Sequence, residues 1–178
     1  MTQFADMQTL WLRGGFPGSY MAASDDAAWQ WRDAFVRHFL STDLPAAVGV
    51  ALDPEQMRRF WRMVAHLHGQ MFNASAVAAS LGVSQPTVAR YLDHLTQTLM
   101  LRRLEPYHAN VGKRLVKSPK VYVRDSGLLH YLLNIKTQGD LSGHPATGAS
   151  WEGFVIEQIC NQLPAGAMVS FYRTAAGA

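Results

Sequence analysis

Residues Asn73–Leu95 have the sequence NASAVAASLGVSQPTVARYLDHL, which is typical of two helices joined by a tight turn. Gly82 supplies the conformational freedom that a helix end needs, and Ser84 followed by Pro86 is typical of the start of a second helix. Apolar residues recur at helical spacing on both sides of the turn, at Ala74, Val77, Ala78, Leu81, Val88, Tyr91, Leu92, Leu95 and Leu99. We therefore predict a helix-turn-helix whose second helix spans Ser84–Thr98.

The other face of this second helix carries side chains that can hydrogen-bond to a base edge or a phosphate. Those nearest to the bases of a bound duplex would be Gln85, Thr87, Arg90 and His94. Asp93 lies close to this face and Arg90 is its only cation, so a structural three-helix unit or a protein-docking surface remains an alternative.

The segments around the motif complete the order of a winged helix. The preceding helix is predicted to begin in a capping box at Asp53–Gln56 and would be the first helix of the three-helix unit. An extended run at Met100–Leu104 follows the motif, and a second strand is predicted at Lys120–Val123. The loop between them, about Asn110–Pro119, would be the wing.

Positive charge is concentrated directly after the motif. The whole chain carries a net charge of +3, whereas residues 100–124 contain seven Lys and Arg residues against one Glu, a net charge of +6. The alternative is a solvated loop, or a basic face that grips a partner protein. The wing cations predicted to neutralise phosphates of double-stranded DNA are Lys113, Arg114, Lys117 and Lys120.

The flanking segments are predicted to be helical and to end in a strand. Ala27–Thr42 should form a helix that Pro45 stops, and a shorter helix is predicted at Leu128–Leu133. Met168–Tyr172 is a predicted strand, after which the chain ends at Ala178 with no capping element. The helix that precedes this strand carries its apolar residues on one side, at Trp151, Val155, Ile159 and Leu163.

Four stretches together resemble one prokaryotic family. They are RGGFPGSY (13–20), FVRHFLSTDLP (35–45), NVGKRLVKSPKVYVRDSGLLHYLL (110–133) and HPATGASWEGFVIEQI (144–159). The family is that of predicted AAA-type ATPases whose C-terminal half is a domain of unknown function. The resemblance implies a P-loop ATPase core, a helical lid, a winged helix and a restriction-endonuclease-like domain in series.

This chain departs from the family pattern at both ends. It has no Gly-x-x-x-x-Gly-Lys-Ser/Thr sequence to cradle phosphates, and it ends before the acidic residue and aspartate that usually follow the family's final strand. The resemblance therefore implies a fragment or truncated gene product with no cofactor of its own, whereas ATP and a divalent cation would belong to an intact relative. The implied domains are a lid remnant at 1–48, a winged helix at 49–124 and an incomplete nuclease-like α/β segment at 125–178.

The turn Gly14-Gly15-Phe16-Pro17 has two interpretations. In the related ATPases a glycine-proline turn at the start of the lid packs against the bound nucleotide, so the resemblance gives that role to Gly15 and Pro17 in an intact protein. The simpler interpretation is a turn that starts a helix.

No catalytic or metal-binding residue is predicted on this chain. Glu152 matches the family's first-helix glutamate, but it has no partners, so it is interpreted as a capping or solvated residue. Glu157 lies five residues further along the same helix and points more than a quarter turn away from Glu152. Asp125 is interpreted as an N-cap or turn residue. His66 and His68 are two residues apart on a helix and point to different faces, so they cannot chelate one ion together.

Composition limits the class of protein further. The single cysteine, Cys160, excludes an internal disulfide and is interpreted as a packed thiol. No apolar run is long enough to cross a membrane, and the first residues lack a signal-peptide pattern, so we expect a cytoplasmic protein.

The sequence thus predicts a mainly α fold with a small β part, in which a winged helix-turn-helix is flanked by a lid remnant and a truncated α/β segment. The predicted function is a non-catalytic DNA-binding or adaptor module of an AAA-type ATPase. A protein-interaction module, docking on an ATPase core or on a second copy, is the first alternative, favoured if Trp29, Trp31 and Trp61 are exposed. A fragment of a nucleotide-dependent nuclease is the second alternative.

Overall fold

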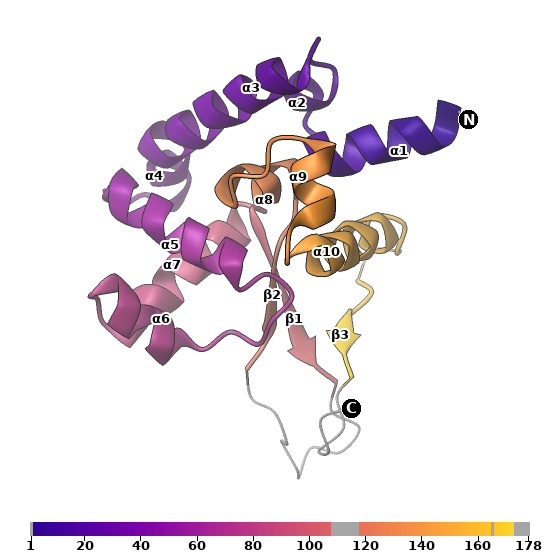
Figure 1. The fold of residues 1–178 in the computed structure, drawn as a ribbon. Coiled ribbons are helices and arrows are strands. Elements are labelled where there is room, and N and C mark those ends of the chain that lie inside the picture. The colour runs from indigo at the N-terminus through magenta and orange to yellow at the C-terminus, as the bar shows by residue number, and fades with distance from the viewer. Residues whose placement is uncertain (1, 108–117, 165, 173–178) are drawn as a thin grey trace.

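The computed structural model of the chain describes residues 2–107, 118–164 and 166–172 (Figure 1). It is mainly helical with one small mixed sheet, as the sequence predicts. The helical segments are α1 (Thr2–Arg13), α2 (Pro17–Tyr20), α3 (Asp25–His38), the π-helical turn η1 (Phe39–Asp43), α4 (Leu44–Val48), α5 (Pro54–His66), α6 (Ala74–Leu81), α7 (Gln85–Gln97), α8 (Ser126–Leu132), α9 (Gln138–Gly143) and α10 (Thr147–Cys160). The strands are β1 (Leu101–Pro106), β2 (Lys120–Val123) and β3 (Ser170–Phe171). Among the described residues, no helix combines the length and the apolar composition needed to span a bilayer.

The two helices and the turn predicted for the opening motif are present as α6 and α7. The Asn73 side chain accepts a hydrogen bond from the backbone N–H of Ala76 (3.1 Å), and Ser84 accepts one from the N–H of Thr87 (3.3 Å). Gly82 ends α6 with a φ of 72°, in the left-handed region that favours glycine. Local capping therefore sets the bounds of both helices.

The start of α5 follows the prediction only in part. The Asp53 side chain accepts a hydrogen bond from the Glu55 N–H (3.0 Å), which caps the helix. The second hydrogen bond of the predicted capping box, from the Asp53 N–H to the Gln56 side chain, is wrong. The Gln56 side chain accepts a hydrogen bond from the Tyr91 hydroxyl instead. A contact between α5 and α7 has replaced a local one.

The prediction that Pro45 stops the helix from Ala27 is also wrong. The chain passes from α3 through η1 into α4, and Pro45 lies in the first turn of α4. The turn before Pro45 is π-helical, with the Leu44 N–H bonded to the Phe39 carbonyl, and proline, which has no N–H, is tolerated in the first turn of the α-helix that follows. The helical run ends at Gly49, where φ is 69°.

The predicted stripe of α7 is buried except at its end. Val88, Leu92 and Leu95 are buried, whereas Leu99 follows the C-cap Thr98 and is 64% exposed. Its φ of 64° lies in the left-handed region, so Leu99 no longer continues the helix and leaves the stripe.

The apolar side predicted for α10 is largely exposed. Trp151, Ile159 and the following Leu163 are exposed, whereas Gly153 and Glu157 are buried. Helical spacing predicted the helix and its apolar side, but this side does not pack into the core, whereas Phe154, outside the stripe, is buried.

The sheet separates α10 from α5, α6 and α7 (Figure 1). β1 pairs antiparallel with β2 from Leu101↔Val123 to Leu104↔Lys120, and β3 pairs parallel with β1 at Glu105↔Ser170. Because side chains alternate along a strand, Arg102 reaches α10 on one side of the sheet and Arg103 reaches α7 on the other.

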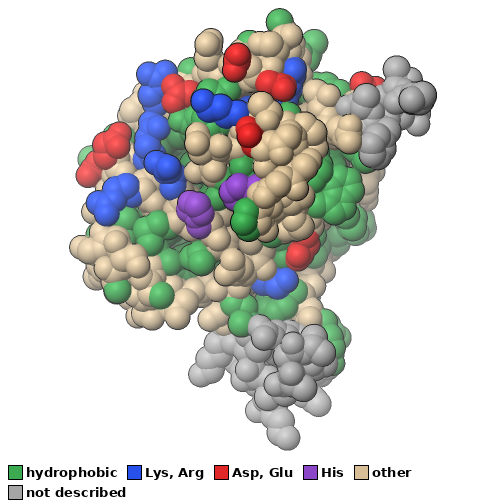
Figure 2. Space-filling model, in the orientation of Figure 1, with side chains coloured by type: hydrophobic (Ala, Val, Ile, Leu, Met, Phe, Trp, Pro, Cys, Tyr) green, Lys and Arg blue, Asp and Glu red, His purple; other side chains and the backbone are tan. Residues whose placement is uncertain are grey.

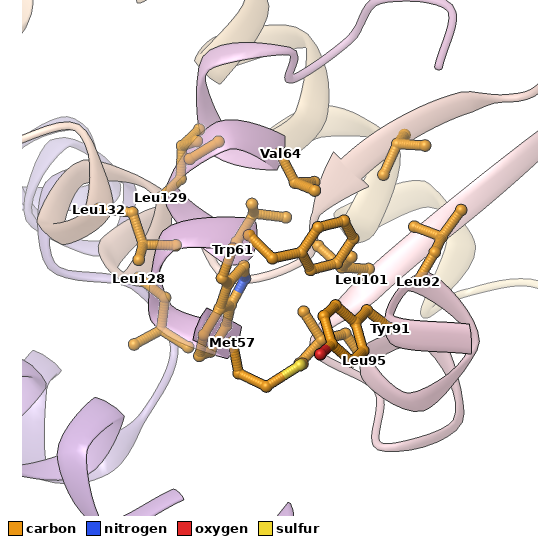
Figure 3. Close-up of a cluster of buried hydrophobic side chains, with 14 of the residues drawn as sticks. Met57, Trp61, Val64, Tyr91, Leu92, Leu95, Leu101, Leu128, Leu129 and Leu132 are labelled. Carbon is orange, nitrogen blue, oxygen red and sulfur yellow. The ribbon is translucent and has the colours of Figure 1, made fainter. Parts of the chain in front are cut away.

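One hydrophobic cluster joins residues from all three predicted segments, including Leu12 and Val36 near the N-terminus. Its centre is formed by residues of α5, α7, β1 and α8 (Figure 3), among them Met57, Trp61, Leu95, Leu101 and Leu128. Each of these side chains is at most 1% exposed. The division into 1–48, 49–124 and 125–178 stays a prediction.

Candidate functional site

The outward face of α7 presents two of the four residues that were predicted to lie nearest to DNA bases. Gln85 and Arg90 are exposed. Thr87 is half-buried, and its hydroxyl lies 2.9 Å from that of Ser84, so it belongs to the helix cap. His94 is half-buried, and within the described residues both of its ring nitrogens are buried without a hydrogen-bond partner. Thr87 and His94 are therefore less available to a ligand than Gln85 and Arg90.

A hollow of about 360 Å³ lies beside this face, between α7, the N-terminal end of α6, β1 and the residues that precede β2. Gln85 lines its α7 side, and Ser118 and Pro119, at the base of the predicted wing, line the opposite side. Arg103 in its wall lies 2.7 Å from the Asp93 carboxylate. Gln85 therefore lines the hollow, whereas Arg90 is exposed on α7 outside its lining.

The predicted wing cations do not all lie on the α7 side of the sheet. Lys113, Arg114 and Lys117 lie outside the described residues. Lys120 faces the other side of the sheet, where its ammonium lies 3.3 Å from a Glu152 oxygen and 5.7 Å from the centre of the Phe171 ring. Lys120 therefore does not join α7, because strand alternation directs it toward α10.

The positive charge predicted after the motif is neutralised within the described part of the chain. Each described Lys or Arg of residues 100–124 lies within 4.0 Å of a carboxylate. The carboxylates come mainly from α7 and α10, which lie outside that window. The pairs are Arg102–Glu157, Arg103–Asp93, Arg103–Glu105, Lys120–Glu152 and Arg124–Glu157.

Glu157 has two arginine partners that the sequence did not predict. It is 6% exposed and accepts hydrogen bonds from Arg102 and from Nε of Arg124 (2.9 Å). The hydrogen bond to Glu157 raises the pKa of Arg102. Two guanidinium groups compensate the cost of burying the carboxylate, and only the fold brings them together.

Glu152 also has partners that were not predicted. Besides Lys120, it accepts a hydrogen bond from the Tyr122 hydroxyl (2.6 Å). Burial and this hydrogen bond raise the pKa of Tyr122. Among the residues that the structure describes, no group of three or more His, Cys, Asp or Glu could hold a metal ion.

A second cavity, of about 440 Å³, lies where several turns meet. Gly15 is in its wall, whereas Pro17 lies in the first turn of α2. The Gly15 N–H donates to Asp125 (2.7 Å), and Asp125 also caps α8 by accepting from the Leu128 N–H (2.8 Å), which confirms its predicted N-cap role. Burial raises the pKa of Asp125, and these hydrogen bonds oppose the shift.

Sequence patterns did not identify this cavity, because its wall combines residues from four separate parts of the chain. No single helix or strand carries enough of the lining to produce a periodic signal. The lining residues are Leu10, Gly15, Phe16, Thr98, Leu99, Met100, Arg124, Asp125, Ser126, Leu128, Phe154, Glu157, Gln158 and Asn161.

Two histidines are buried and join helices to the rest of the fold. His68 accepts a hydrogen bond from the Val123 N–H (3.0 Å), and burial lowers its pKa to about 4. His130 is hydrogen-bonded to the Leu12 carbonyl (2.9 Å) and to the Ser150 hydroxyl (2.7 Å), and burial lowers its pKa to about 4. Both histidines are neutral at pH 7.

The tryptophans do not provide the exposed surface on which the protein-interaction alternative depended. Trp61 is fully buried, and Trp29 and Trp31 are half-buried. Cys160 is a half-buried free thiol. Large exposed apolar side chains instead lie on α10 and after it, at Trp151, Ile159, Leu163, Met168 and Tyr172.

A second group of cations was missed because its members are spread over two helices. Figure 2 shows Lys and Arg side chains gathered over α3–α5 on one face of the molecule. The exposed arginines of α3 and α5 are Arg37, Arg59 and Arg62.

Comparison with known proteins gives a family and relatives. Residues 4–139 match the model of a family described as a domain of unknown function (DUF8612). The chain is 51% identical over 154 residues to the uncharacterized proteins Mb2031c of Mycobacterium bovis and Rv2008c of Mycobacterium tuberculosis. The matched part covers 86% of this chain but 35% of each relative, so the chain spans about a third of their length. No solved structure matches the chain.

These comparisons overturn the resemblance to AAA-type ATPases. The family match extends over most of the chain, whereas the resemblance rested on four short stretches. Short turn motifs such as Gly15–Pro17 recur wherever a helix starts after a glycine, so they identify a family poorly. The nucleotide role of Gly15 and Pro17 therefore loses its basis.

Proposed function

Since the chain belongs to the family described as a domain of unknown function (DUF8612), we propose from its own surface that it binds double-stranded DNA without catalysis. In this proposal α5, α6 and α7 with β1 and β2 form a winged helix, and α7 enters the major groove. The observation that carries the proposal is the exposed polar face of α7 beside the hollow that it shares with α6 and β1.

Base recognition is assigned to the N-terminal half of α7, because that end of a recognition helix reaches furthest into the groove. Gln85 and Arg90 are the exposed predicted contacts there. A glutamine amide matches the edge of adenine, and an arginine matches the edge of guanine or a phosphate.

Phosphate contacts are assigned to the start of α6 and to the predicted wing. Asn73 caps α6 and accepts a hydrogen bond from the Ser75 hydroxyl (2.7 Å), and both residues line the hollow. Backbone amides at a helix start favour an anion. Lys113, Arg114 and Lys117 would supply the remaining phosphate contacts.

The paired arginines limit the number of phosphate contacts. Arg102, Arg103 and Arg124 already neutralise carboxylates of this chain, so binding relies on Arg90 and the wing lysines and arginine. We therefore expect a few contacts, each adding about −0.9 to the slope of log affinity against log salt concentration.

The test is fluorescence anisotropy of a labelled random-sequence duplex at several salt concentrations. Wild type should bind with a dissociation constant of roughly micromolar order and weaken with salt. Arg90→Ala should make this slope shallower by about the value of one phosphate contact. Lys113→Ala, Arg114→Ala and Lys117→Ala combined should make it shallower by the value of up to about three contacts.

Arg62→Ala is the matched control, because it removes the same charge from the exposed face of α5. Its salt slope should equal that of wild type. The proposal would be refuted by an absence of binding at low salt, or by a larger effect of Arg62→Ala than of Arg90→Ala.

Self-association is a second candidate, favoured by the exposed apolar side of α10. Ile159 is 54% exposed and Trp151 is 38% exposed on this side. Sedimentation equilibrium of wild type and Ile159→Glu would separate it from the first candidate. If wild type self-associates through α10, its average molecular mass should exceed that of a monomer, and Ile159→Glu should lower it to the monomer mass. The nuclease-like interpretation of residues 125–178 stays a prediction and enters neither candidate.

A further inference from the structure

The cavity of about 440 Å³ described above has the volume of a small-molecule site. It lies between the α1–α2 turn, the α7–β1 turn, the β2–α8 turn and the C-terminal half of α10. We propose that it binds a small organic anion, an apolar body that carries one carboxylate.

The apolar part of the ligand is matched by side chains from each side of the cavity. Leu10 and Phe16 come from the N-terminal region, Met100 from the α7–β1 turn, and Phe154 from α10. A cavity with apolar walls and a few polar groups at defined positions is the usual form of a site for a small organic molecule.

The polar part of the wall offers hydrogen-bond donors. Nε of Arg124 is bonded to Glu157, whereas its two terminal nitrogens have no hydrogen-bond partner among the described residues. The exposed amide side chains of Gln158 and Asn161 lie in the same wall. A guanidinium fork and neighbouring amides match the geometry of a carboxylate.

The carboxylates of the wall do not oppose an anion, because protein donors already engage them. Asp125 accepts from the backbone N–H groups of Gly15 and Leu128. Glu157 accepts from Arg102 and Arg124.

The charges around the cavity are unbalanced. Arg32 lies near Asp125 and also near Asp25, which is paired with Arg13 (2.8 Å), while Arg102 and Arg124 share Glu157. Four guanidinium groups thus act on three carboxylates. Arg32 is 1% exposed, so its charge is poorly screened by solvent. One positive charge is left in excess, which favours a ligand with one negative charge.

Leu99 gives an independent indication that something covers the cavity mouth. It is a leucine with a φ of 64°, and its apolar side chain is 64% exposed. A left-handed backbone and an exposed leucine are each unfavourable, and such combinations are concentrated where ligands bind. A bound apolar body would cover this side chain.

The same residue connects the cavity to α7, since Thr98, Leu99 and Met100 join α7 to β1. Through this connection a bound anion would change the affinity of α7 for DNA. This effect, unlike the binding site, rests on the proposed function. The experiment below measures the site alone.

The experiment is an amide NMR titration of the full chain with phenylacetate, with its neutral analogue phenylacetamide, and with acetate. Phenylacetate should shift the amide signals of Leu99, Met100 and Gln158 in a saturable way. Phenylacetamide should bind roughly tenfold more weakly, because it lacks the charge that Arg124 recognises. Acetate, which has no apolar body, should give no saturable shift.

A matched pair of variants at the cavity mouth tests the location. Asn and Asp both tolerate the left-handed conformation and have the same size, so Leu99→Asn and Leu99→Asp should both fold. Leu99→Asp should bind phenylacetate roughly tenfold more weakly than Leu99→Asn, because only Asp repels the anion. Arg124→Gln should also lose binding of phenylacetate. Because this substitution breaks an ion pair with Glu157, the variant could unfold, and in that case the comparison of the two Leu99 variants is the deciding test.

Three results would overturn the proposal. They are no saturable shift with phenylacetate, equal affinity for phenylacetate and phenylacetamide, and equal affinity of the two Leu99 variants. Loss of DNA binding in the anisotropy experiment would leave all three measurements unchanged, so the two proposals fail separately.

Discussion

Helices α7 and α10 carry similar apolar stripes in the sequence, yet the fold buries them in opposite ways. In α7 the stripe faces the core, with Val88 and Leu95 fully buried. In α10 the stripe faces out, with Ile159 54% exposed, while Gly153 and Glu157 face in. Periodicity identified both helices and their apolar sides, but only the fold decided that the apolar side of α10 stays largely exposed.

The difference lies in what each helix packs against. α7 packs against the apolar residues of α5 and β1, so burying its apolar stripe gives the largest gain (Figure 3). α10 packs against a sheet face that carries Arg102, and a carboxylate on the buried side can pair with it. On the same side, Gly153 lets α10 approach the ring of His68 closely, because a Cβ atom at this position would overlap that ring. The buried face is therefore the one that complements its neighbour.

The largest expected effect is the loss of a buried apolar side chain from α7. Leu95→Ala should lower the free energy of unfolding by about 4 kcal/mol, because Leu95 is fully buried and leaves a cavity. Ile159→Ala on the exposed side of α10 should change it by less than about 0.5 kcal/mol. Urea unfolding measures both. Equal losses would mean that the α10 stripe is buried in solution, which would remove the contrast.

The next effect concerns the charge that α10 buries. Glu157→Gln should lower the free energy of unfolding by about 3 kcal/mol, because Arg102 and Arg124 lose their counter-charge in a buried site. Glu152→Gln is the control on the same helix. Its amide oxygen can still accept the hydrogen bond of the Tyr122 hydroxyl, and the loss of its pair with Lys120 should cost less than about 1 kcal/mol. A smaller loss for Glu157→Gln than for Glu152→Gln would show that apolar packing alone orients α10.

The smallest of the three single-residue effects is the contribution of each buried histidine beside α10 to the pH dependence of stability. His68 and His130 contact α10 residues, and burial lowers the pKa of each from 6.5 to about 4. The unfolded chain therefore binds protons that the folded chain excludes, so stability is present above pH 6.5 and is lost as the pH falls toward 4. By pH 5 each histidine should account for a loss of about 2 kcal/mol relative to pH 7.

Urea unfolding at pH 7 and pH 5 measures this loss. His130→Gln should reduce the difference between the two pH values by about 2 kcal/mol, while the exposed His66→Gln should leave it unchanged. The same pH dependence in wild type and His130→Gln would contradict the assignment.

The sequence by itself determined the local features of this protein. Gly82, Ser84 and Asp125 set helix ends as predicted, because caps and left-handed turns depend on residues only a few positions apart. The buried stripe of α7 up to Leu95 could also be predicted from local spacing. Its partners in α5 and β1 are apolar, so the apolar side of the helix is the side that they bury.

Only the tertiary structure decided which side of α10 is buried, where the cations point and where the cavity lies. The Glu157 pairs join residues 55 and 33 positions apart, and the register of β1 and β2 places both arginines at one carboxylate. The wall of the cavity likewise combines turns from separate parts of the chain, which share no sequence pattern. Charge pairing and cavity shape depend on distances between distant segments, and no local periodicity encodes those distances.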